Sequence, residues 1–202
     1  MQSFSDKNNI LSKFGTEAKI VLELGCGPNR RIPGSIGIDI LDLESVDIVT
    51  DLNQGLSFIP SDSVDEIYSF HFLEHLDNLA AFMKEIHRVL KKGGKKIGKV
   101  PHSVNPYFFS DPTHKTFFGL YTFCYFSKSY KYRRKVPNFY NEIDFEISVN
   151  RIIMHSEFPL RKFFKKIWQK FFNSNTWLLE YYEENMVYIF PPYELYFELV
   201  KR

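Results

Sequence analysis

The chain has 202 residues, 44% hydrophobic and 25% charged, which is enough for one globular domain with a full core and excludes a largely disordered or collagen-like chain. The formal net charge of +2 gives no argument for a nucleic-acid partner. Two cysteines, Cys26 and Cys124, are too few for a disulfide framework, and without a leader-like N-terminus or an apolar run of about 20 residues we expect a cytoplasmic protein.

The first half of the chain has the pattern of an α/β protein. Residues 1–18 give a weak signal for a short helix, with Ile10, Leu11 and Phe14 on one side. From residue 79 to 90, apolar side chains recur at helical spacing after a candidate N-cap, Asp77, and the run 91–94 ends the helix. Short apolar, β-branched runs predict strands over 19–24, 36–40, 46–49, 64–70 and 96–101.

The second half is less regular and holds most of the aromatic residues, which make up 17% of the chain. We expect a short helix over 112–118, a strand over 145–153, an amphipathic helix over 160–172 and a strand over 193–200. A linker between domains is not evident. The pattern predicts one domain over 1–202, with 1–101 as its ligand-binding half and 102–202 as an aromatic-rich elaboration on the acceptor side.

Strands separated by crossovers predict a doubly wound, mostly parallel, Rossmann-like sheet. Such sheets bind ligands at the carboxyl ends of their strands. The predicted strands place five features near that edge: the loop at Gly25, Asp39, Asp51, His71 and His102.

The glycine loop after the first of these strands does not fit a dinucleotide site. Arg30 stands where a third glycine would be required, and Asp39 follows Gly27 by only 12 residues. Pro28 and Pro33 leave no room for a regular helix, so a ligand without a pyrophosphate fits better. Asp39 can hold two ribose hydroxyls. A purely structural turn at Gly25 and a solvated carboxylate at Asp39 remain alternatives.

Three segments carry a resemblance to a known family: VLELGCGPNRRIPGSIGIDI, DIVTDLNQGLSFIPSDSVDEIYSFHFLEHLDN and EIHRVLKKGGKK. They resemble the class I S-adenosylmethionine-dependent methyltransferases, in particular the type-11-like branch and its subgroup with a helix-less loop after the first strand, which is common among bacterial glycan-assembly enzymes. The resemblance covers residues 20 to about 101 closely. SDPTHKTFF and IFPPYELYFELVK are similar to this subgroup less specifically.

The resemblance implies S-adenosylmethionine as the cofactor and assigns residues to its parts. Asn29 and Arg30 depart from the family pattern, which leaves the path of the loop open. The implied cofactor-binding residues are Glu23, Gly25, Cys26 and Gly27 beside the methionine part, Asp39 with Ile40 at the ribose, Asp51 and Leu52 at the adenine, and Ser69, Phe70 and His71 near the sulfonium.

A hydroxyl acceptor must lose its proton during methyl transfer, and a histidine oriented by a carboxylate is the usual base. His71, His75, His102 and His114 are candidates. We predict His114 as the base with Asp111 as its orienting carboxylate, and we expect His71 to contact the acceptor or the cofactor. The alternative for the first pair is that Asp111 caps a short helix and His114 lies on its surface.

Glu74 and His75 also suggest a metal site. Some related RNA and small-molecule methyltransferases use acidic and histidine ligands near this point. A second pair with suitable spacing is not evident in the sequence, so the prediction is that no metal is bound.

The predicted helix over 160–172 is basic and amphipathic, with aromatic residues along its apolar face. Such a helix can lie on an anionic membrane. The more ordinary interpretation is that the apolar face covers the sheet or the active site. A second basic run over 131–135 could contact phosphate, although a solvated loop is the commoner role for such a run.

The expected function is methyl transfer from S-adenosylmethionine to a hydroxyl of a sugar or of another glycan or lipid-linked precursor. A nicotinamide-dependent oxidoreductase is opposed by the missing third glycine and the missing helix. The remaining alternative is a catalytically silent module with the same fold that binds a membrane surface or RNA.

Overall fold

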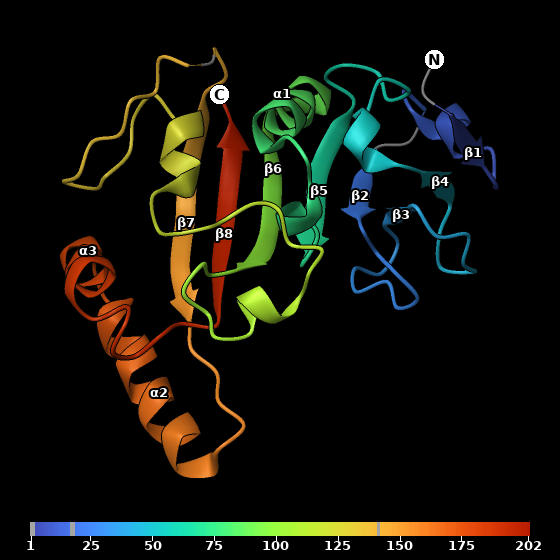
Figure 1. The fold of residues 1–202 in the computed structure, drawn as a ribbon. Helices are drawn as coiled ribbons and strands as arrows, with labels where there is room; N and C mark the ends of the chain where they lie inside the picture. Colours follow the sequence, from blue (N-terminus) through green and yellow to red (C-terminus); the bar gives the residue numbers. More distant parts are fainter. Residues whose placement is uncertain (1–2, 17–18, 141) are drawn as a thin grey trace.

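The computed structural model describes residues 3–16, 19–140 and 142–202 (Figure 1). Its described strands form one sheet, in the order β1-β4-β3-β2-β5-β6-β8-β7. Strands from both halves of the chain take part. Their bounds are β1 Phe4–Asp6, β2 Val21–Leu24, β3 Ile36–Asp39, β4 Ile48–Thr50, β5 Val64–Phe70, β6 Leu90–Pro101, β7 Phe145–Ile153 and β8 Glu194–Lys201.

The centre of the sheet is parallel and its edges are antiparallel. Strands β4, β3, β2, β5 and β6 pair in parallel, while β1, β8 and β7 join in the antiparallel sense. The chain order reverses on either side of β2, which makes the carboxyl end of β2 the switch point where such sheets bind ligands. The predicted α/β, Rossmann-like class is confirmed.

Some elements differ from the sequence prediction. Helix α1 (Leu79–Val89) is capped by Asn78 rather than Asp77, because the Asn78 side chain accepts from the Ala81 N–H. β6 begins directly at Leu90, six residues earlier than expected. Near the N-terminus, β1 and a 3-10 helix over Ile10–Lys13 replace the expected short helix, and the Asp6 carboxylate accepts from the first N–H groups of the 3-10 helix.

The predicted helix over 112–118 is absent from the described chain, and the reason is tertiary. The N–H groups of Lys115 and Thr116 donate to the carbonyl oxygen of Glu74, at 2.7 and 3.0 Å, instead of to carbonyls within their own segment. This contact holds the segment after Asp111 against the end of β5. Helix α3 (Thr176–Asn185) was not predicted, since its apolar residues lack a clear helical period.

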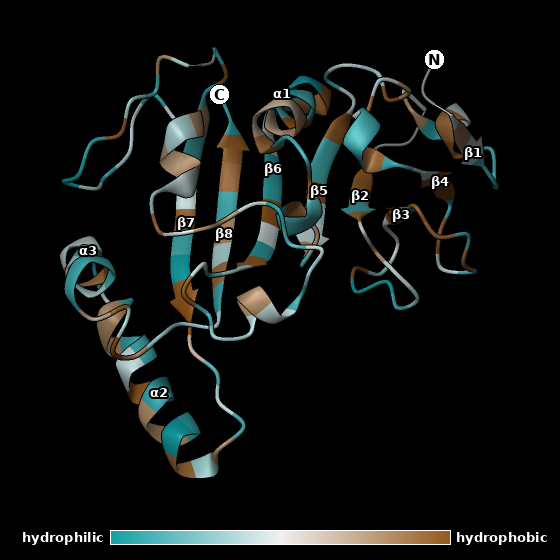
Figure 2. Cartoon of the chain, in the orientation of Figure 1, coloured by the Kyte–Doolittle hydropathy of each residue, from teal (hydrophilic) through white to brown (hydrophobic). Residues whose placement is uncertain are grey.

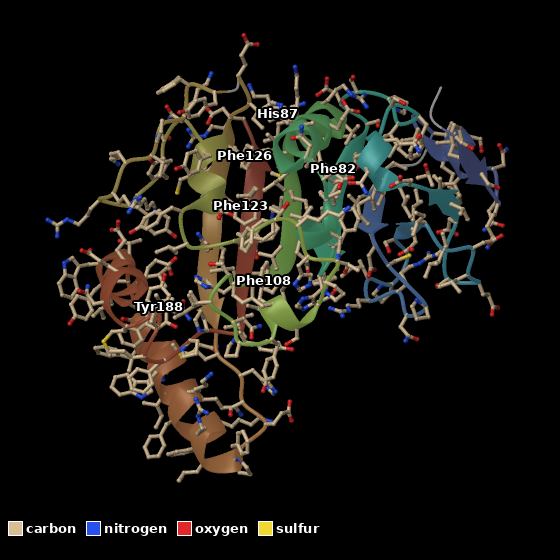
Figure 3. All side chains as sticks on the ribbon, in the orientation of Figure 1. Phe82, His87, Phe108, Phe123, Phe126 and Tyr188 are labelled. Atoms are coloured by element: carbon tan, nitrogen blue, oxygen red, sulfur yellow. The ribbon has the colours of Figure 1, made fainter. Side chains whose placement is uncertain are left out.

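One face of the sheet carries most of the core. On that face Phe123 stacks on Phe197 of β8 with ring centroids 4.0 Å apart, and His87 of α1 contacts Phe145 of β7. Figure 3 shows Phe82, Phe123 and Phe126 between the covering segments and the strands. The opposite face over β5, β6 and β8 is partly open to solvent, and polar side chains alternate there: Glu66, Tyr68, Lys95, Lys99 and Glu198.

Helix α2 (Pro159–Phe172) extends away from the sheet together with α3 (Figure 1). Figure 2 shows hydrophobic and hydrophilic residues alternating along it. Of its predicted apolar face, only Trp168 and Phe172 pack inward, against Phe190 and Tyr182. The expectation that this face covers the sheet or the active site is therefore wrong for most of its length. No helix in the described chain has both the length and the apolar character needed to cross a bilayer.

Candidate active site

A cavity of about 270 Å³ lies at the carboxyl ends of the central strands, where the sheet order reverses. Its walls come from the loops after β2, β3, β4 and β5. Residues that the sequence assigned to the cofactor or to catalysis make up most of it. The lining residues are Gly25, Asp39, Ile40, Asp51, Leu52, Asn53, His71, Phe72 and His75.

Gly25 makes the floor of this cavity. Its φ of +64° is a left-handed conformation that side chains disfavour, and a Cβ atom there would lie 2.7 Å from Cδ2 of Phe72. Its N–H donates to the Ile38 carbonyl at 2.8 Å, which holds the turn against β3. Only glycine allows the backbone and the Phe72 ring to approach this closely.

Asp39 ends β3 with its carboxylate fixed by the backbone. Oδ2 accepts from the Gly27 N–H at 2.9 Å, and Oδ1 accepts from the Leu41 N–H at 3.0 Å. Each oxygen keeps a further lone pair, so the carboxylate can accept two hydroxyl groups from a ligand in the cavity. Asp51 is held similarly, because its Oδ1 accepts from the Asn53 N–H at 2.9 Å and caps a 3-10 helix over Leu52–Gln54.

Arg30 determines the path of the helix-less loop. Its guanidinium donates to the carbonyl oxygens of Ser35 and Ser45 and pairs with Asp47 Oδ2 at 2.7 Å. The departure from the family pattern at this position therefore has a structural role: one arginine fastens the loop to the β3–β4 connection.

The side chains of Glu23 and Cys26 are buried within the loop after β2 and do not line the cavity. The buried Glu23 carboxylate accepts from the N–H groups of Arg31 and Ile32, the latter at 2.8 Å. Cys26 is buried, and desolvation, aided by the nearby Asp39 charge, raises the pKa of its thiol to about 11. The Cys26 thiol is therefore un-ionised at neutral pH and contributes to packing.

Ser69 and Phe70 lie away from the cavity lining. Ser69 is fully buried on the core face, where its Oγ accepts from Lys96 Nζ at 2.6 Å. Phe70 points to the other face, and the Arg31 guanidinium lies 5.0 Å from its ring centroid. Neither side chain contacts the space that Gly25 and Asp39 enclose.

His71 lines the cavity and lies between two carboxylates. Its Nε2 is 2.9 Å from Glu194 Oε1, and its Nδ1 is 3.5 Å from Glu74 Oε1. The hydrogen bond to Glu194 and the contact with Glu74 raise the pKa of His71 to about 9, against the effect of burial. The ring is therefore protonated at neutral pH, and its φ of +57° is an uncommon conformation for histidine.

The predicted pair of His114 and Asp111 is close in space, but with a different geometry. His114 Nδ1 is 2.8 Å from the Phe108 carbonyl, which fixes the proton on Nδ1. Asp111 Oδ2 lies 3.6 Å from Nε2, the other nitrogen. Asp111 Oδ1 accepts from the N–H and the hydroxyl of Thr113. The Phe108 carbonyl, not Asp111, orients the His114 ring.

His75 lies between His114 and the cavity. It lines the cavity itself, and its ring centroid is 5.0 Å from that of His114. His102, by contrast, is buried, and its Nε2 lies 3.2 Å from Glu183 Oε2. Sequence reasoning did not assign Glu194, although it lies in IFPPYELYFELVK, nor Phe72, which directly follows His71.

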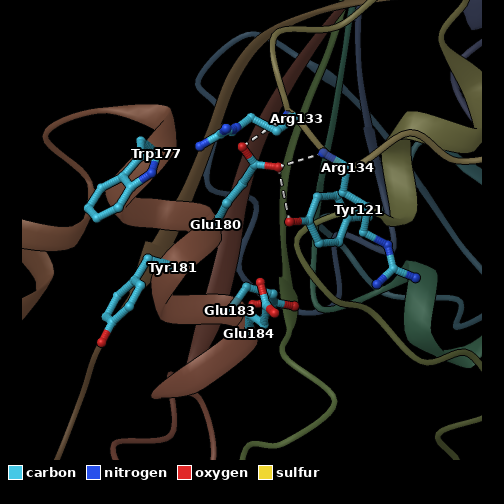
Figure 4. A pocket seen from close by; sticks show the side chains of 8 residues that line it. All are labelled: Tyr121, Arg133, Arg134, Trp177, Glu180, Tyr181, Glu183 and Glu184. Atoms are coloured by element: carbon cyan, nitrogen blue, oxygen red, sulfur yellow. Dashed lines mark hydrogen bonds between the residues drawn. The ribbon is translucent and has the colours of Figure 1, made fainter.

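A larger hollow of about 660 Å³ lies beside α3 (Figure 4). Its polar groups hold segments of the fold together. Glu180 accepts from the N–H groups of Arg133 and Arg134 and from the Tyr121 hydroxyl, and Glu183 accepts from the Leu120 N–H. None of its lining residues is among those assigned to the cofactor or to catalysis.

Comparison with known proteins agrees with this geometry. Residues 39–97 match the model of a methyltransferase-domain family, type 11. A Haloferax volcanii methyltransferase, solved with the Trm112 methyltransferase activator, is similar over 97% of this chain and 88% of that chain, with a TM-score of 0.55 and 16% identity. No curated protein sequence matches the chain.

Two further solved structures share the fold. The YcgJ protein of Bacillus subtilis has a TM-score of 0.52 at 16% identity, covering 98% of each chain. A SAM-dependent methyltransferase from Archaeoglobus fulgidus has a TM-score of 0.50 at 16% identity, covering 96% of this chain and 92% of that chain. The family match runs from residue 39 to residue 97, which is less than half of the chain, and the solved structures show that the chain has the fold of S-adenosylmethionine-dependent methyltransferases.

Proposed function

We propose that this chain is an S-adenosylmethionine-dependent methyltransferase of the type-11 branch, and that it acts on a hydroxyl group of a sugar or of another glycan or lipid-linked precursor. One observation carries the proposal. His71 and His75 line the cavity, and His114 lies next to His75. His114 Nε2 makes no hydrogen bond among the described residues, has Asp111 Oδ2 3.6 Å away and is bordered by exposed aromatic rings. A base and a stacking surface side by side suit a hydroxylated acceptor.

The cavity fits the adenosyl part of the cofactor. Gly25 lets the backbone approach a ligand where any side chain would collide with Phe72. The Asp39 carboxylate has lone pairs for the two ribose hydroxyls, and Asp51 has one for the amino group of adenine. When bound, S-adenosylmethionine supplies an activated methyl group, so these residues need only hold it and leave its methyl accessible to the acceptor.

His114 is the better proton acceptor of the two histidines assigned to catalysis. His71 already carries a proton at neutral pH, because Glu194 and Glu74 stabilise its charge. His114 has its Nδ1 proton engaged by the Phe108 carbonyl, and its Nε2 lone pair is the free one. We therefore assign proton removal to His114 and assign His71 to fixing the cavity wall against the last strand.

The aromatic rings around His114 support a sugar acceptor. The Phe108 ring centroid lies 4.7 Å from that of His114 and 5.1 Å from that of Phe117. Phe109 and Phe117 are 72% and 59% exposed, so their rings are available to a ligand. Flat, exposed aromatic rings can stack on the apolar C–H face of a pyranose or pack on a lipid chain.

Helix α2 supports a lipid-linked form of that acceptor. Five apolar side chains along one stripe of the helix are about half exposed or more: Leu160, Phe163, Phe164, Ile167 and Phe171. With 100° per residue, Lys170 lies at one edge of this stripe, Lys166 lies farther from it, and Lys162 lies toward the opposite side of the helix. An apolar stripe bordered by a cation is complementary to an anionic lipid surface, where each cation near the surface contributes about 1 kcal/mol.

A vesicle assay tests the membrane contact. We expect the protein to pellet with vesicles of phosphatidylglycerol and phosphatidylcholine at low salt, and the double variant Phe163→Ser, Phe164→Ser to stay in the supernatant. Phe139→Ser is the matched control, because Phe139 is 78% exposed and lies outside α2. Equal pelleting of all three proteins, or of none, would remove the membrane from the proposal.

A transfer assay tests the acceptor class. Methyl-labelled S-adenosylmethionine is supplied with three acceptor sets: soluble sugars and sugar nucleotides, polyprenyl-linked glycans, and the amine phosphoethanolamine. The proposal predicts label in an O-methyl ether of a sugar, lost in His114→Asn. Label on nitrogen, or transfer that survives in His114→Asn, contradicts it.

A further inference from the structure

Glu74, His75 and His114 form a cluster of side chains whose ligand atoms all lie within 4.8 Å of one another. The first two residues belong to a 3-10 helix over Leu73–His75 that follows β5, and the third comes from the segment after Asp111. Hydrogen bonds from Lys115 and Thr116 to the Glu74 carbonyl fasten the two segments together. The backbone therefore brings residues 39 or 40 positions apart in the sequence to one point.

The Glu74 carboxylate makes no hydrogen bond among the described residues and has His71 as a more distant ion-pair neighbour. The residue is fully buried, and neither of its oxygens has a hydrogen-bond partner among the described residues. Its closest cationic neighbour is His71 Nδ1, 3.5 Å from Oε1, which is longer than a hydrogen bond. The His71 ring makes its shorter contact with Glu194, so it compensates the buried Glu74 charge only in part, and the Glu74 carboxylate can accept a further cation.

The two histidines present the same nitrogen to the cluster. His75 Nδ1 is 2.9 Å from the Thr113 hydroxyl, and His114 Nδ1 is 2.8 Å from the Phe108 carbonyl. Each ring is therefore oriented through Nδ1, which leaves Nε2 to bind an ion, and in His114 that nitrogen also has Asp111 Oδ2 3.6 Å away. Metal-bound histidines have this arrangement, in which an oxygen fixes the ring through the nitrogen that does not bind the metal.

We propose that Glu74, His75 and His114 bind a divalent transition-metal ion, with zinc the ion that the donors fit best. Two imidazole nitrogens and one carboxylate oxygen are the ligand set of catalytic zinc sites, which keep a fourth position open. Two nitrogen ligands disfavour calcium and magnesium, which prefer oxygen. Zinc bonds of about 2.0–2.2 Å at tetrahedral angles place ligand atoms about 3.4 Å apart, so zinc binding would draw together ligand atoms that now lie within 4.8 Å of one another.

The ion would lie beside the cofactor cavity, because His75 contributes to both. The part that the ion would play in methyl transfer rests on the proposed function, whereas the binding of the ion to the protein does not. With the ion present, His114 would act as a ligand, and the role of base assigned to it above would apply to the metal-free protein only. An acceptor hydroxyl in the open position would release its proton to solvent more readily. The acceptor oxygen then takes the methyl group, while the electron pair of the methyl–sulfur bond stays on sulfur.

Metal binding can be measured without any acceptor. The full chain is stripped with a chelator and titrated with Zn²⁺ by calorimetry and with Co²⁺ by visible absorption. We expect one equivalent to bind, with the intense d–d bands of tetrahedral Co²⁺. Glu74→Gln and His114→Asn should each weaken binding at least a hundredfold. His155→Asn, which alters the solvent-exposed pair of His155 and Glu157, should bind as the parent does.

The Glu74 variant could fail to fold, so a second variant at an exposed residue is used to test the same site. Thr113→Val changes an exposed side chain and removes only the hydroxyl beside His75, so it should fold normally and weaken Zn²⁺ binding about tenfold. The absence of stoichiometric binding by the parent chain, or equal binding by the parent, His114→Asn and Thr113→Val, overturns the proposal. Calorimetry with S-adenosylmethionine on the stripped protein tests the proposed function separately, since cofactor binding without metal binding removes only the metal.

Discussion

Glu194, the first residue of β8, places its Oε1 2.9 Å from Nε2 of His71, the residue that follows β5. Lys99 of β6, the strand between them, lies 3.4 Å from the other oxygen of the same carboxylate. The second half of the chain therefore reaches the cavity at Gly25 and Asp39 through one buried acid. The pairing connects the antiparallel end of the sheet to the site that the parallel strands build.

This pairing predicts a pH-dependent stability. The folded-state pKa of His71 is about 9, above its ordinary 6.5, so the stabilisation is complete below about pH 6.5 and is lost as the pH rises through 9. A third of the side chain is exposed, which reduces the contribution to about 1–2 kcal/mol. In metal-free protein, urea unfolding from pH 6 to 10 should show this loss, and His71→Gln should lack it. Parallel curves for both proteins would refute the assignment.

Gly25→Ala should abolish cofactor binding and destabilise the fold by about 1–3 kcal/mol, because it adds a Cβ against Phe72 at a left-handed backbone position. Gly34→Ala is the matched control. Gly34 also has a positive φ, +75°, but a Cβ there meets nothing within 4 Å, so only backbone strain of about 1 kcal/mol is expected. Thermal unfolding and cofactor calorimetry measure both. Equal effects of the two substitutions on binding would contradict the role of Gly25.

Arg30→Met should loosen the loop around the cofactor cavity. The variant leaves the carbonyls of Ser35 and Ser45 and the Asp47 carboxylate without their guanidinium partner, at a cost of about 2–3 kcal/mol. Arg30→Lys should recover little, since one ammonium group cannot reach all three oxygens. Chemical denaturation measures the cost, and calorimetry should show weaker cofactor binding. Full recovery by lysine would mean that charge alone matters here.

Lys96→Met should stabilise the protein by about 1–2 kcal/mol at pH 7. Lys96 is fully buried, and desolvation lowers its pKa well below the ordinary value. Its unfolded state binds the extra proton, so the stability of the parent rises with pH up to about 10.5. Denaturation at pH 7 and pH 10 should show the advantage of the variant shrinking. A destabilised variant would mean that the bonds to Ser69 and Ile97 outweigh the desolvation.

The sequence predicted the central strands and α1 well, because apolar runs and helical spacing are local signals. It placed the Gly25 loop, Asp39, Asp51, His71 and His102 near one edge of the sheet, and in the structure all of these except His102 line one cavity. It could not give the path of the loop, since the contacts of Arg30 with Ser45 and Asp47 cross 15 or more residues. Alternation of polar residues in β5 and β6 was the available sign that one face of the sheet is partly open.

The histidine sites illustrate the limit of short-range reasoning. Asp111 and His114 are neighbours in sequence, but the ring is oriented by the Phe108 carbonyl instead. The partners of His71 and of the Glu74–His75 pair lie 123 and 39 residues away. Spacing alone does not reveal such pairings. The short helix expected over 112–118 failed for the same reason, because Glu74 takes its N–H groups.

The central claim is that the Asp39 carboxylate, fixed by the Gly27 and Leu41 N–H groups, holds the ribose of S-adenosylmethionine in the cavity over Gly25. Calorimetric titration of the parent chain and of Asp39→Ala with S-adenosylmethionine tests it most directly. We predict one binding site in the parent and at least tenfold weaker binding in the variant. Absence of binding by the folded parent chain, or equal affinity in both proteins, would contradict it.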